Sequence, residues 1–444
     1  MEQKFLLDLD ELRKSLNYRD YKTLRQLFKE SEIADVAEAL SELDMAESIA
    51  LFRLVPRQSR SKLFSYLSLE RQEELLEELP DVIVASLMNE MEPDDRTKLL
   101  EDIPLRLRNK ILLKLRPEER EVAWQLLSYP ENSVGRLMTP DFLALSPEML
   151  VSEALEYIHW STALPVEDLN YLFVTADDGK LLGEVTLASL VVCDPPSLSV
   201  ADCMKKSYVS LAPDDEETLA VETFRKYDRH FIPVLDKDSK LIGIVTADDV
   251  FDVAEEEATE DIQQFGGHGA LEDSYFNTPF LTMFKKRAGW LALLFLAGFI
   301  TGEAIKNYED LLNQFAFLIF FLPTITSAGG NSGSQSASLI IRGFAIKEMD
   351  LSDVWKVLRK EIFIGLSLGL VLALLGYSRA LTWSYGFEVG LIVATSVVCV
   401  VIFGAVVGAM LPFLFQKLRL DPAVVSAPVI STLVDVTGVM ILFN

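Results

Sequence analysis

The C-terminal part of the chain is too apolar, over too great a length, to fold as a water-soluble domain. A helix needs about 20 predominantly apolar residues, at 1.5 Å of rise each, to cross the hydrocarbon core of a bilayer. Residues 284–444 contain five stretches that fit this length, at 288–305, 311–341, 362–381, 386–415 and 423–443. They predict an all-α domain of five membrane-spanning helices.

The second of these stretches is interrupted. Pro323 lies within it and is followed by GGNSGSQS at 329–336. Glycines allow the backbone to leave helical geometry, which membrane proteins tolerate where that backbone is buried in protein or lines a wet cavity. On this interpretation Asn331 lines a passage. Small residues also let membrane helices pack closely, and the segment alone favours neither interpretation.

The last stretch carries a carboxylate at membrane depth. Asp421 and Pro422 have the pattern of an N-terminal cap followed by a first-turn proline. Pro428 then frees backbone carbonyls near Ala427. Asp435 lies 14 residues beyond Asp421, roughly 21 Å along a helix. An ionised carboxylate at that depth costs about 2.5–3.5 kcal/mol unless it faces water or a cation. Asp435 therefore predicts an ion site, and the alternative is a structural hydrogen bond or a protonated acid.

Lysine and arginine are distributed unequally around the five stretches, and such an excess marks the cytoplasmic side of a membrane protein. Only Lys306 and Arg379 fall on one side. The ten on the other side are Lys285, Lys286, Arg287, Arg342, Lys347, Lys356, Arg359, Lys360, Lys417 and Arg419. This distribution predicts a multi-pass protein of the cytoplasmic (inner) membrane, with its N-terminal part in the cytoplasm and its C-terminus outside.

The N-terminal part is strongly acidic. The whole chain has 67 acidic and 41 basic residues, of which 284–444 hold 10 and 12, so residues 1–283 hold 57 and 29. Such a balance disfavours nucleic-acid binding, and an apolar content of 50% excludes a disordered chain. The cysteines Cys193, Cys203 and Cys399 show no metal-binding or redox spacing, which indicates a reducing compartment. No zinc-protease, phosphate-loop or serine-hydrolase motif stands on a suitable element, so we do not expect an enzyme.

A repeat of 24 residues runs through 43–127. Pro56, Pro80 and Pro104 each follow a pair that ends in an apolar residue, and the residues between the prolines have helical apolar spacing. This pattern predicts stacked helix pairs, a small α-solenoid. The alternative is an ordinary helical bundle.

A second repeat begins near residue 138. MTPDFLALSPE (138–148) matches MKKSYVSLAPD (204–214), and GKLLGEVTLASL (179–190) matches SKLIGIVTADDV (239–250). Each copy has the pattern of strand, helix, strand, turn, strand and helix. The sequence thus predicts two related α/β domains.

The duplicated pattern resembles tandem cystathionine-β-synthase (CBS) domains, a ligand-sensing module. Such pairs often bind adenosyl nucleotides through a G-x-x-T-x-x-D arrangement. The second copy has Gly243, Thr246 and Asp249, whereas the first has Ser189 in place of the carboxylate. The resemblance implies ATP as a modulator, with Tyr171, Thr246 and Asp249 as the nucleotide-binding residues.

An acidic segment follows the second copy. Between Asp248 and Asp261 there are eight acidic residues and no basic one. Asp249, Asp252 and Glu260 belong to one stripe of a helix, where like charges are unfavourable. A charge run of this kind is ordinarily a solvated face.

Taken together, these parts, their order and the D-x-T-G motif at 435–438 resemble the MgtE family of Mg²⁺ channels. The resemblance implies a homodimer in a lipid bilayer, with one pore on its two-fold axis and Mg²⁺ as the transported ion. The pore and selectivity residues that it implies are Asp435, Ala427, Asn331 and Asp421.

The resemblance also implies the fold class, which is a multidomain membrane protein, and the boundaries of its domains. In this family an acidic connecting helix, the plug helix, meets the cytoplasmic mouth of the pore. The parts are an N-terminal α-solenoid (1–135), two α/β CBS domains (136–200 and 201–253), the plug helix (248–267) and an all-α five-helix transmembrane domain (284–444).

Cytoplasmic Mg²⁺ is expected, by the same resemblance, to close the pore by binding acidic side chains between the N-terminal, CBS and plug-helix parts. The sequence leaves the register open by one residue within PDD (93–95) and PDDEE (213–217). The residues that match the regulatory metal positions are Asp95, Asp214, Glu216, Asp228, Asp249, Asp252, Glu257, Glu260 and Asp261.

Two other functions fit the sequence. One is a CBS-regulated transporter of another divalent cation, such as Co²⁺ or Mn²⁺, or of another solute. The other is a membrane protein that senses Mg²⁺ without conducting it.

Overall fold

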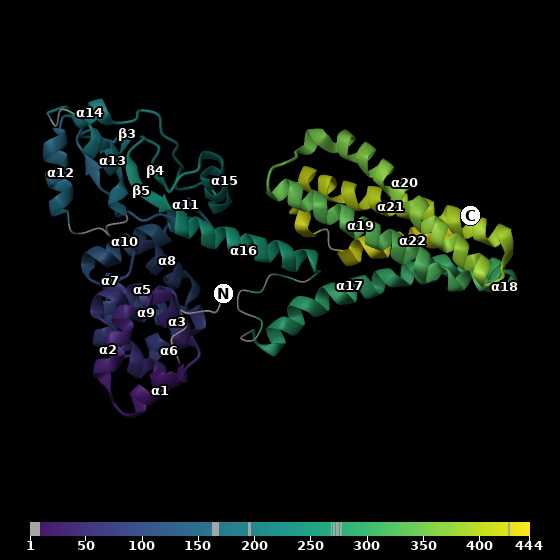
Figure 1. The fold of residues 1–444 in the computed structure, drawn as a ribbon, viewed down its shortest axis with the longest axis horizontal. Helices are drawn as coiled ribbons and strands as arrows, with labels where there is room; N and C mark the ends of the chain where they lie inside the picture. The colour runs from purple at the N-terminus through teal and green to yellow at the C-terminus, as the bar shows by residue number, and fades with distance from the viewer. Residues whose placement is uncertain are drawn as a thin grey trace. The chain divides into compact units, whose positions relative to one another are not determined.

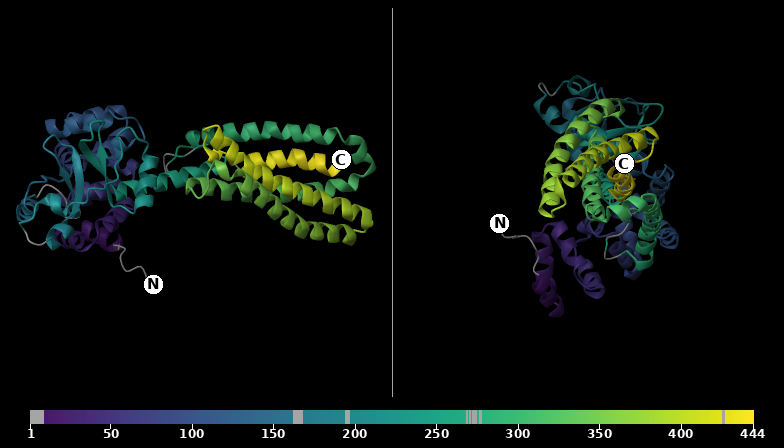
Figure 2. Two further views of the ribbon diagram at one scale, coloured as in Figure 1. Left: turned by 90° about the horizontal axis from the view of Figure 1, so that it is seen from above. Right: turned by 90° about the vertical axis from the view of Figure 1, so that its right-hand side faces the viewer.

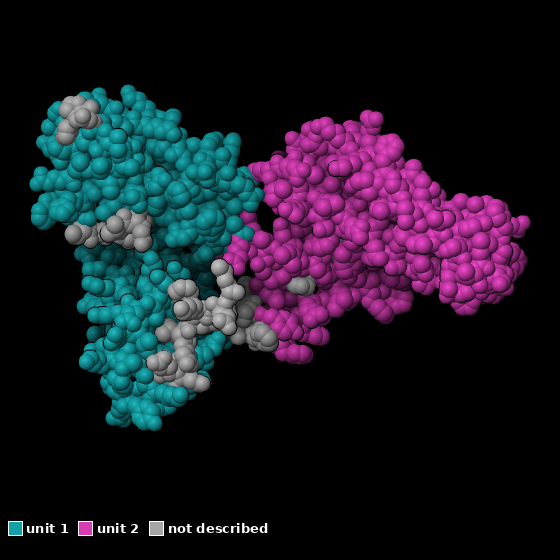
Figure 3. Space-filling model, viewed as in Figure 1, with its two compact units in different colours: residues 1–254 teal, residues 255–444 magenta. Residues whose placement is uncertain are grey.

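The computed structural model describes residues 9–161, 168–193, 197–267, 269, 271, 275, 278–424 and 427–444. The chain divides into two compact units, residues 1–254 and residues 255–444, which Figure 3 shows in different colours. Helix α16 (Ala247–Phe265) begins in the first unit and continues into the second.

The N-terminal part of the first unit is all helical (Figure 1). Its helices are α1 (Leu9–Asn17), α2 (Tyr21–Glu30), α3 (Ile33–Ser41), α4 (Met45–Phe52), α5 (Arg60–Ser65), α6 (Leu69–Glu78), α7 (Asp81–Glu90), α8 (Pro93–Asp102), α9 (Leu105–Leu112) and α10 (Pro117–Leu127). Helices α4, α6, α8 and α10 begin 24 residues apart, which confirms the helix-pair repeat. Pro80 and Pro104 immediately precede α7 and α9, with φ of −56° and −54°.

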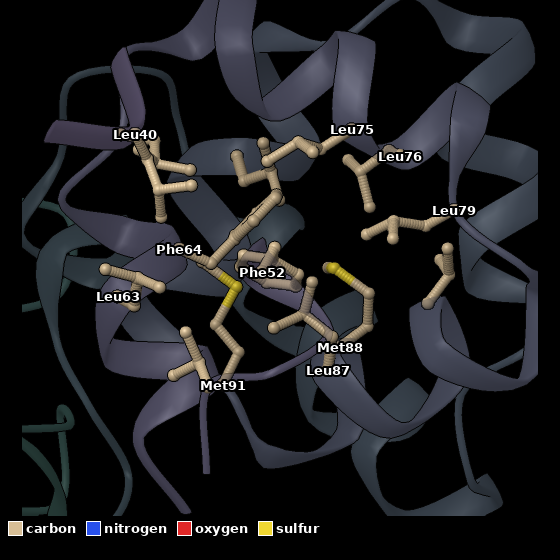
Figure 4. Close-up of a cluster of buried hydrophobic side chains, with 14 of the residues drawn as sticks. Leu40, Phe52, Leu63, Phe64, Leu75, Leu76, Leu79, Leu87, Met88 and Met91 are labelled. Carbon is tan, nitrogen blue, oxygen red and sulfur yellow. The ribbon is translucent and has the colours of Figure 1, made fainter. Parts of the chain in front are cut away.

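One apolar core joins these helices. Figure 4 shows its centre, where Phe52, Phe64, Leu76 and Met88 converge from four different helices. The rings of Phe52 and Phe64 meet edge to face with centroids 6.2 Å apart. Since each helix pair buries its apolar face against its neighbours, the pairs stabilise one another as solenoid repeats do.

Two α/β halves follow. The first contains α11 (Val134–Leu137), β1 (Ala144–Leu145), α12 (Val151–Trp160), β2 (Tyr171–Thr175), β3 (Leu181–Thr186) and α13 (Leu187–Val192). The second contains α14 (Val200–Cys203), α15 (Glu217–Tyr227), β4 (Phe231–Leu235), β5 (Leu241–Thr246) and the start of α16.

The strand pairing repeats the sequence duplication. Strand β1 pairs parallel to β2, and β2 pairs antiparallel to β3, while β4 and β5 form an antiparallel pair. Both hairpins have an irregularity at the same place, between Val174 and Thr175 and between Val234 and Leu235. Thr139 also bridges to β5, as Lys205 bridges to β3, so each half contributes a residue to the sheet of the other.

The cysteines differ from the prediction. Cys193 and Cys203 form a disulfide, with Cα atoms 6.5 Å apart, across the connection from α13 to α14. Cys399 is free. The expectation that the spacing of these cysteines has no redox meaning was therefore wrong, because the nine residues between Cys193 and Cys203 bring the two thiols together in a way that spacing alone does not reveal.

The second unit is a bundle of long apolar helices, and Figure 2 shows α19, α21 and α22 lying side by side. Its elements are α17 (Phe280–Lys306), α18 (Glu309–Gln314), the 3₁₀ helix η3 (Ala316–Phe320), α19 (Leu322–Ala345), α20 (Val354–Thr382), α21 (Gly386–Lys417), the 3₁₀ helix η5 (Pro422–Val424) and α22 (Ala427–Phe443). Among the described residues, three helical segments are long and apolar enough to span a bilayer, α17, α20 with the 3₁₀ turn before it, and α21. Helix α22 has 17 residues and α19 has 24, and their spanning stays a prediction.

The interruption of the second stretch lies earlier than the sequence suggested. The chain breaks between α18 and α19, and Pro323 lies in the first turn of α19. Gly329 and Gly330 belong to a continuous helix, so the expectation that the backbone leaves helical geometry there was wrong. Small-residue packing explains these glycines instead.

Helices α19 and α21 cross at their backbones. A Cβ atom added to Gly404 would lie 2.1 Å from the carbonyl oxygen of Gly329, and one added to Gly408 would lie 2.0 Å from that of Gly333. Each helix therefore presents a G-x-x-x-G pair to the other, the arrangement that lets membrane helices approach most closely. No larger side chain fits at this crossing without separating the helices.

Candidate functional site

The carboxylate of Asp435 lies where α22 packs against α19. The side-chain hydroxyl of Thr326 in α19 donates a hydrogen bond to this carboxylate. A Cβ added to Gly438, one turn further along α22, would lie 2.8 Å from the Cγ2 atom of Thr326. Asp435 itself is partly buried. The close packing at Gly438 thus holds Asp435 beside a polar group of the neighbouring helix.

A groove of about 620 Å³, with both polar and apolar residues in its lining, opens along α19. Asn331 and Gln335 lie on its α19 wall, and Leu368 and Leu372 of α20 lie opposite. The Nδ2 atom of Asn331 is 3.5 Å from the Oγ atom of Ser327, at the limit of hydrogen bonding. Among the described residues, the groove lining includes Asn331 but not Asp435.

The predicted entrance residue Asp421 does not cap the last helix. Its Oδ1 atom accepts a hydrogen bond from the backbone of Ala423 at 2.8 Å, within η5, and α22 begins only at Ala427. The interpretation of one continuous helix from Asp421 to Asp435 was therefore wrong. Ala427 is eight residues from Asp435, about 12 Å along α22. Pro428 lies in the first turn of the helix, where a missing N–H is tolerated.

The end of α16 lies beside Asp421. Burial, then the charges of Asp421 and Glu260, raise the pKa of the Asp261 carboxyl. Phe265, in the last turn of α16, packs against the apolar core of the second unit. Asp261, a predicted regulatory residue, and Asp421, a predicted pore residue, are thus neighbours in the structure.

A second group of acids forms in the first unit, between the start of α8 and the start of α16. Burial is the main cause that raises the pKa of Asp94, followed by the charge of Asp249. Burial also raises the pKa of Asp95, assisted by Asp248 and Asp252. The structure therefore brings together three predicted regulatory residues, Asp95, Asp249 and Asp252. We call Asp94, Asp95, Asp248, Asp249 and Asp252 the α8–α16 acidic cluster.

The carboxyl groups of Asp94 and Asp249 lie within hydrogen-bonding reach of each other. Burial is the largest cause that raises the pKa of Asp249 to about 7. The Oδ1 atom of Asp94 is buried and, among the described residues, has no hydrogen-bond partner. A buried acceptor without a donor is unfavourable, and a cation or its water shell would supply what it lacks.

Arg96, a buried cation next to this cluster in sequence, forms its ion pair with a residue outside the cluster. Arg96 is completely buried, and its Nη2 atom lies 2.8 Å from the Oε2 atom of Glu119 on α10. Its Nη1 atom donates to the carbonyl of Met88 at 3.2 Å. This network anchors α8 in the helical core and commits the charge of Arg96 to Glu119, while the charge of Lys98 acts on Asp95 and lowers its pKa.

The cluster is not a preformed metal site. No three metal-binding side chains in the described part of the chain are arranged to hold an ion directly. Mg²⁺ releases its inner water reluctantly and is often bound through that water.

Three other predicted regulatory residues lie apart from the cluster. Glu216 precedes α15, and Asp228 follows it with a left-handed φ of 50°. The 11 residues of α15 separate them by about 16 Å, so both do not bind the same ion within one chain. Asp214 is exposed and lies 4.0 Å from Lys237. Of the remaining two, Glu260 accepts a hydrogen bond from Gln264 at 2.7 Å, and Glu257 lies one turn earlier in α16.

The raised pKa of Asp249 predicts a pH dependence of stability. A carboxyl whose pKa is higher in the folded chain than in the unfolded chain stabilises the fold fully at low pH, and this contribution is lost as pH rises through the folded value. In Mg²⁺-free buffer we expect the Tm of the full-length protein in detergent to fall from pH 4 and to level off above about 7. Asp249→Asn should make this slope shallower. An unchanged slope in the variant would exclude Asp249 as its source.

Of the residues predicted for nucleotide binding, Tyr171 and Thr246 lie on the two hairpins and Asp249 lies in the first turn of α16. Tyr171 begins β2, and its ring centroid is 5.1 Å from that of Phe231 in β4. The hydroxyl of Thr246 donates to the carboxylate of Asp249. Ser189 occupies the matching place in the first half, where its hydroxyl lies 2.7 Å from that of Thr186. The two halves thus keep the same geometry, and the carboxylate is present in the second half alone.

Two polar residues were missed by the sequence analysis. Asp94 was passed over in favour of its neighbour, because the register within 93–95 has no local marker. Glu361 in α20 is buried, and the Oγ atom of Ser336 in α19 donates to it at 2.6 Å. The available signal was a carboxylate in the second turn of an apolar helix, since such groups are costly unless partnered.

An acidic helical and α/β part, joined by one long helix to an apolar bundle that contains a carboxylate, defines a multidomain membrane protein. The chain belongs to the MgtE family, as the comparisons with known proteins show. The profile described as "Divalent cation transporter" matches residues 322–444. The MgtE intracellular N domain matches 31–132, and CBS domains match 134–193 and 200–256.

Curated relatives match nearly the whole chain. The magnesium transporter MgtE of Thermus thermophilus is 35% identical over 99% of this chain and 97% of its own length. That of Bacillus subtilis is 30% identical over 94% of both chains.

Solved structures match more than half of the chain. A crystal structure of the soluble part of a magnesium transporter has a TM-score of 0.53 and 25% identity, and covers 56% of this chain and 98% of its own. The cytosolic domain of the Mg²⁺ channel MgtE in complex with ATP has a TM-score of 0.51 and 28% identity, with 55% and 100% covered. The resemblance to the MgtE family, and the predicted order of helical, CBS and membrane parts, are confirmed.

Proposed function

We propose that this chain is a Mg²⁺-selective channel or transporter that mediates Mg²⁺ influx and that cytoplasmic Mg²⁺ closes. Membership of a divalent cation transporter family supports transport, and the names of the full-length relatives support Mg²⁺ as the ion. The single observation that carries the regulatory part is the α8–α16 acidic cluster, whose buried carboxylates are unfavourable without protons or cations. A transport role accounts for every part of the chain without enzymatic chemistry.

The pore part of the proposal assigns ion binding to Asp435, with Asn331, Ala427 and Asp421 along the route. In a homodimer, one copy of Asp435 from each chain would face a common passage on the two-fold axis. At about 8 Å separation and an effective dielectric near 20, the two carboxylates would repel by about 2 kcal/mol. A cation offsets this repulsion. Two carboxylates suit an ion that keeps its water shell, whereas a stripped Ca²⁺ needs 6–8 oxygen ligands.

The gating part assigns closure to the two acidic groups along α16. Mg²⁺ bound among the acids of the α8–α16 cluster would hold the first unit compact, and Mg²⁺ at Asp261 and Asp421 would hold the end of the helix. A ligand shifts such an equilibrium only by its preference for one state, and here the compact state concentrates the carboxylates. The exposed acids Asp214, Glu216 and Asp228 would act between domains or between the two chains.

The domain boundaries, the membrane orientation and the role of ATP are part of the same proposal. We place the N-terminal domain at 1–135, the CBS domains at 136–200 and 201–253, the plug helix at 248–267 and the pore domain at 284–444. The protein would lie in the cytoplasmic membrane with its acidic part in the cytoplasm and its C-terminus outside. ATP would modulate closure through Tyr171, Thr246 and Asp249, a role supported by the ATP-bound relative.

Flux measurements test this proposal. An inside-negative potential is worth about 2.3 kcal/mol per charge per 100 mV, so it drives entry of a divalent cation without an energy source. Purified protein in proteoliposomes should admit Mg²⁺ under an imposed potential and should do so less when Mg²⁺ is present on the cytoplasmic face. Entry of Co²⁺ or Mn²⁺ in preference to Mg²⁺ would favour another divalent cation as substrate. Absence of flux from correctly inserted protein would favour a non-conducting sensor.

A further inference from the structure

The C-terminal end of α16 closes on a tight turn. The backbone N–H of Gly266 donates to Ile262 at 3.0 Å, and that of Gly267 donates to Gln264 at 2.8 Å. Gly267 has a φ of +80°, a conformation that side chains with a Cβ rarely adopt. This turn ends α16 directly after Phe265.

Trp290 of α17 lies against this turn. A Cβ added to Gly267 would lie 2.9 Å from Nε1 of Trp290, 3.0 Å from its Cδ1 atom and 3.5 Å from Cγ of Pro428 in the first turn of α22. The end of α16, the indole of α17 and the start of α22 therefore meet at one point. Gly267 is required there by both its backbone conformation and the lack of space.

Two polar atoms at this contact are buried and, within the described part of the chain, unpaired. They are the indole Nε1 of Trp290, a donor, and the Oε1 atom of Gln264, an acceptor. The amide nitrogen of Gln264 is already engaged with Glu260. A buried donor without an acceptor disfavours the state that buries it, by a factor on the order of tenfold. Docking of the helix end must therefore be driven by other contacts, and Phe265, which packs against the apolar core of the second unit, supplies one of them.

We propose that Trp290 and Gly267 form a latch that positions the end of α16 against the membrane domain and keeps this docking reversible. Gly267 permits the close approach, and the unpaired indole N–H of Trp290 weakens the docked state because undocking exposes it to water. The inference rests on the proposed function, in which the docked plug helix corresponds to the closed pore. Trp290 is a positioning residue, since it acts through the helix end and not on the ion.

Two substitutions should shift docking in opposite directions. Trp290→Phe keeps an aromatic ring but removes the unpaired donor, so the docked state should form more readily. Gly267→Ala introduces a Cβ into the indole and strains the turn, so the docked state should form less readily. Trp355→Phe makes the same aromatic change at an exposed position in α20 and serves as the control.

Hydrogen–deuterium exchange of residues 258–266, measured on the full-length protein in detergent across a Mg²⁺ titration, reports docking directly. Trp290→Phe should lower the Mg²⁺ concentration for half protection by about tenfold, the factor expected for one unpaired donor. Gly267→Ala should raise it by at least that factor. An unchanged midpoint in Trp290→Phe, or a shift in the same direction as Gly267→Ala, would overturn the latch. If Gly267→Ala does not fold, Trp290→Phe decides alone.

Flux in proteoliposomes separates the latch from the gate. If the exchange midpoints move as expected and Mg²⁺ inhibition of flux moves with them, both the latch and the gating proposal stand. If the exchange midpoints move and the flux does not, the latch stands and the proposal that α16 closes the pore fails.

Discussion

Asp435→Asn should reduce Mg²⁺ flux by at least about a hundredfold. The substitution keeps the size of the side chain and a hydrogen-bonding partner for Thr326, and it removes one charge per chain. At 4 Å and an effective dielectric near 20, a pair of unit charges interacts by about 4 kcal/mol. Because a hundredfold change requires about 2.8 kcal/mol, loss of only part of this attraction is sufficient.

The measurement is Mg²⁺ entry into proteoliposomes, with Asp310→Asn as the matched control. Asp310 is an exposed acid of α18, so its substitution removes the same charge from the same unit without touching the α19–α22 packing. Exchange protection of α16 by Mg²⁺ should be unchanged in Asp435→Asn, since regulation is assigned to other acids. Asp435→Asn protein that conducts like the parent would move the selectivity site elsewhere, with Asp421 the next residue to test.

Repetition made the soluble fold predictable. The prolines at 56, 80 and 104 mark helix starts because proline has a fixed φ and no N–H, which suits the residue before a first turn. The duplicated hairpin motifs likewise predicted two related halves, and even the strand irregularities recur at matching places. Such signals are local and periodic, so a single sequence reveals them.

The membrane part was less predictable because its decisive contacts join distant residues. Gly329 and Gly333 have the same appearance whether they break a helix or pack against another, and only the facing Gly404 and Gly408 decide between the two. The disulfide between Cys193 and Cys203 depends in the same way on how the chain returns. The predicted start of the last helix at Asp421 was wrong for a local reason. The Asp421 carboxylate accepts its hydrogen bond from Ala423 in η5, and not from a residue of α22.

The acidic residues were predicted as a class better than as individuals. The resemblance to the MgtE family implied cation binding by acidic residues of this region, and the structure brings Asp95, Asp249 and Asp252 together. It also adds Asp94, which is more deeply buried than Asp95 although the two are adjacent in sequence. The direction of each side chain at a helix start depends on the packing of α8, where Arg96 and Glu119 set the orientation. The spacing of residues in the sequence does not reveal the ion pair between Arg96 and Glu119.

Neutralising the two hydrogen-bonded acids should largely remove the Mg²⁺ dependence of the first unit. Asp94→Asn combined with Asp249→Asn keeps the shapes of both side chains and removes the charges whose burial is unfavourable. Without Mg²⁺, the double variant should resist limited proteolysis as the parent does in millimolar Mg²⁺, because repulsion no longer opens the contact between α8 and α16. Asp177→Asn, at the exposed turn between β2 and β3, removes a charge elsewhere and should behave as the parent. Should the double variant be cleaved as fast as the Mg²⁺-free parent, repulsion within the acidic cluster would not be what Mg²⁺ relieves, and regulation would have to depend on Asp261 and Asp421 instead.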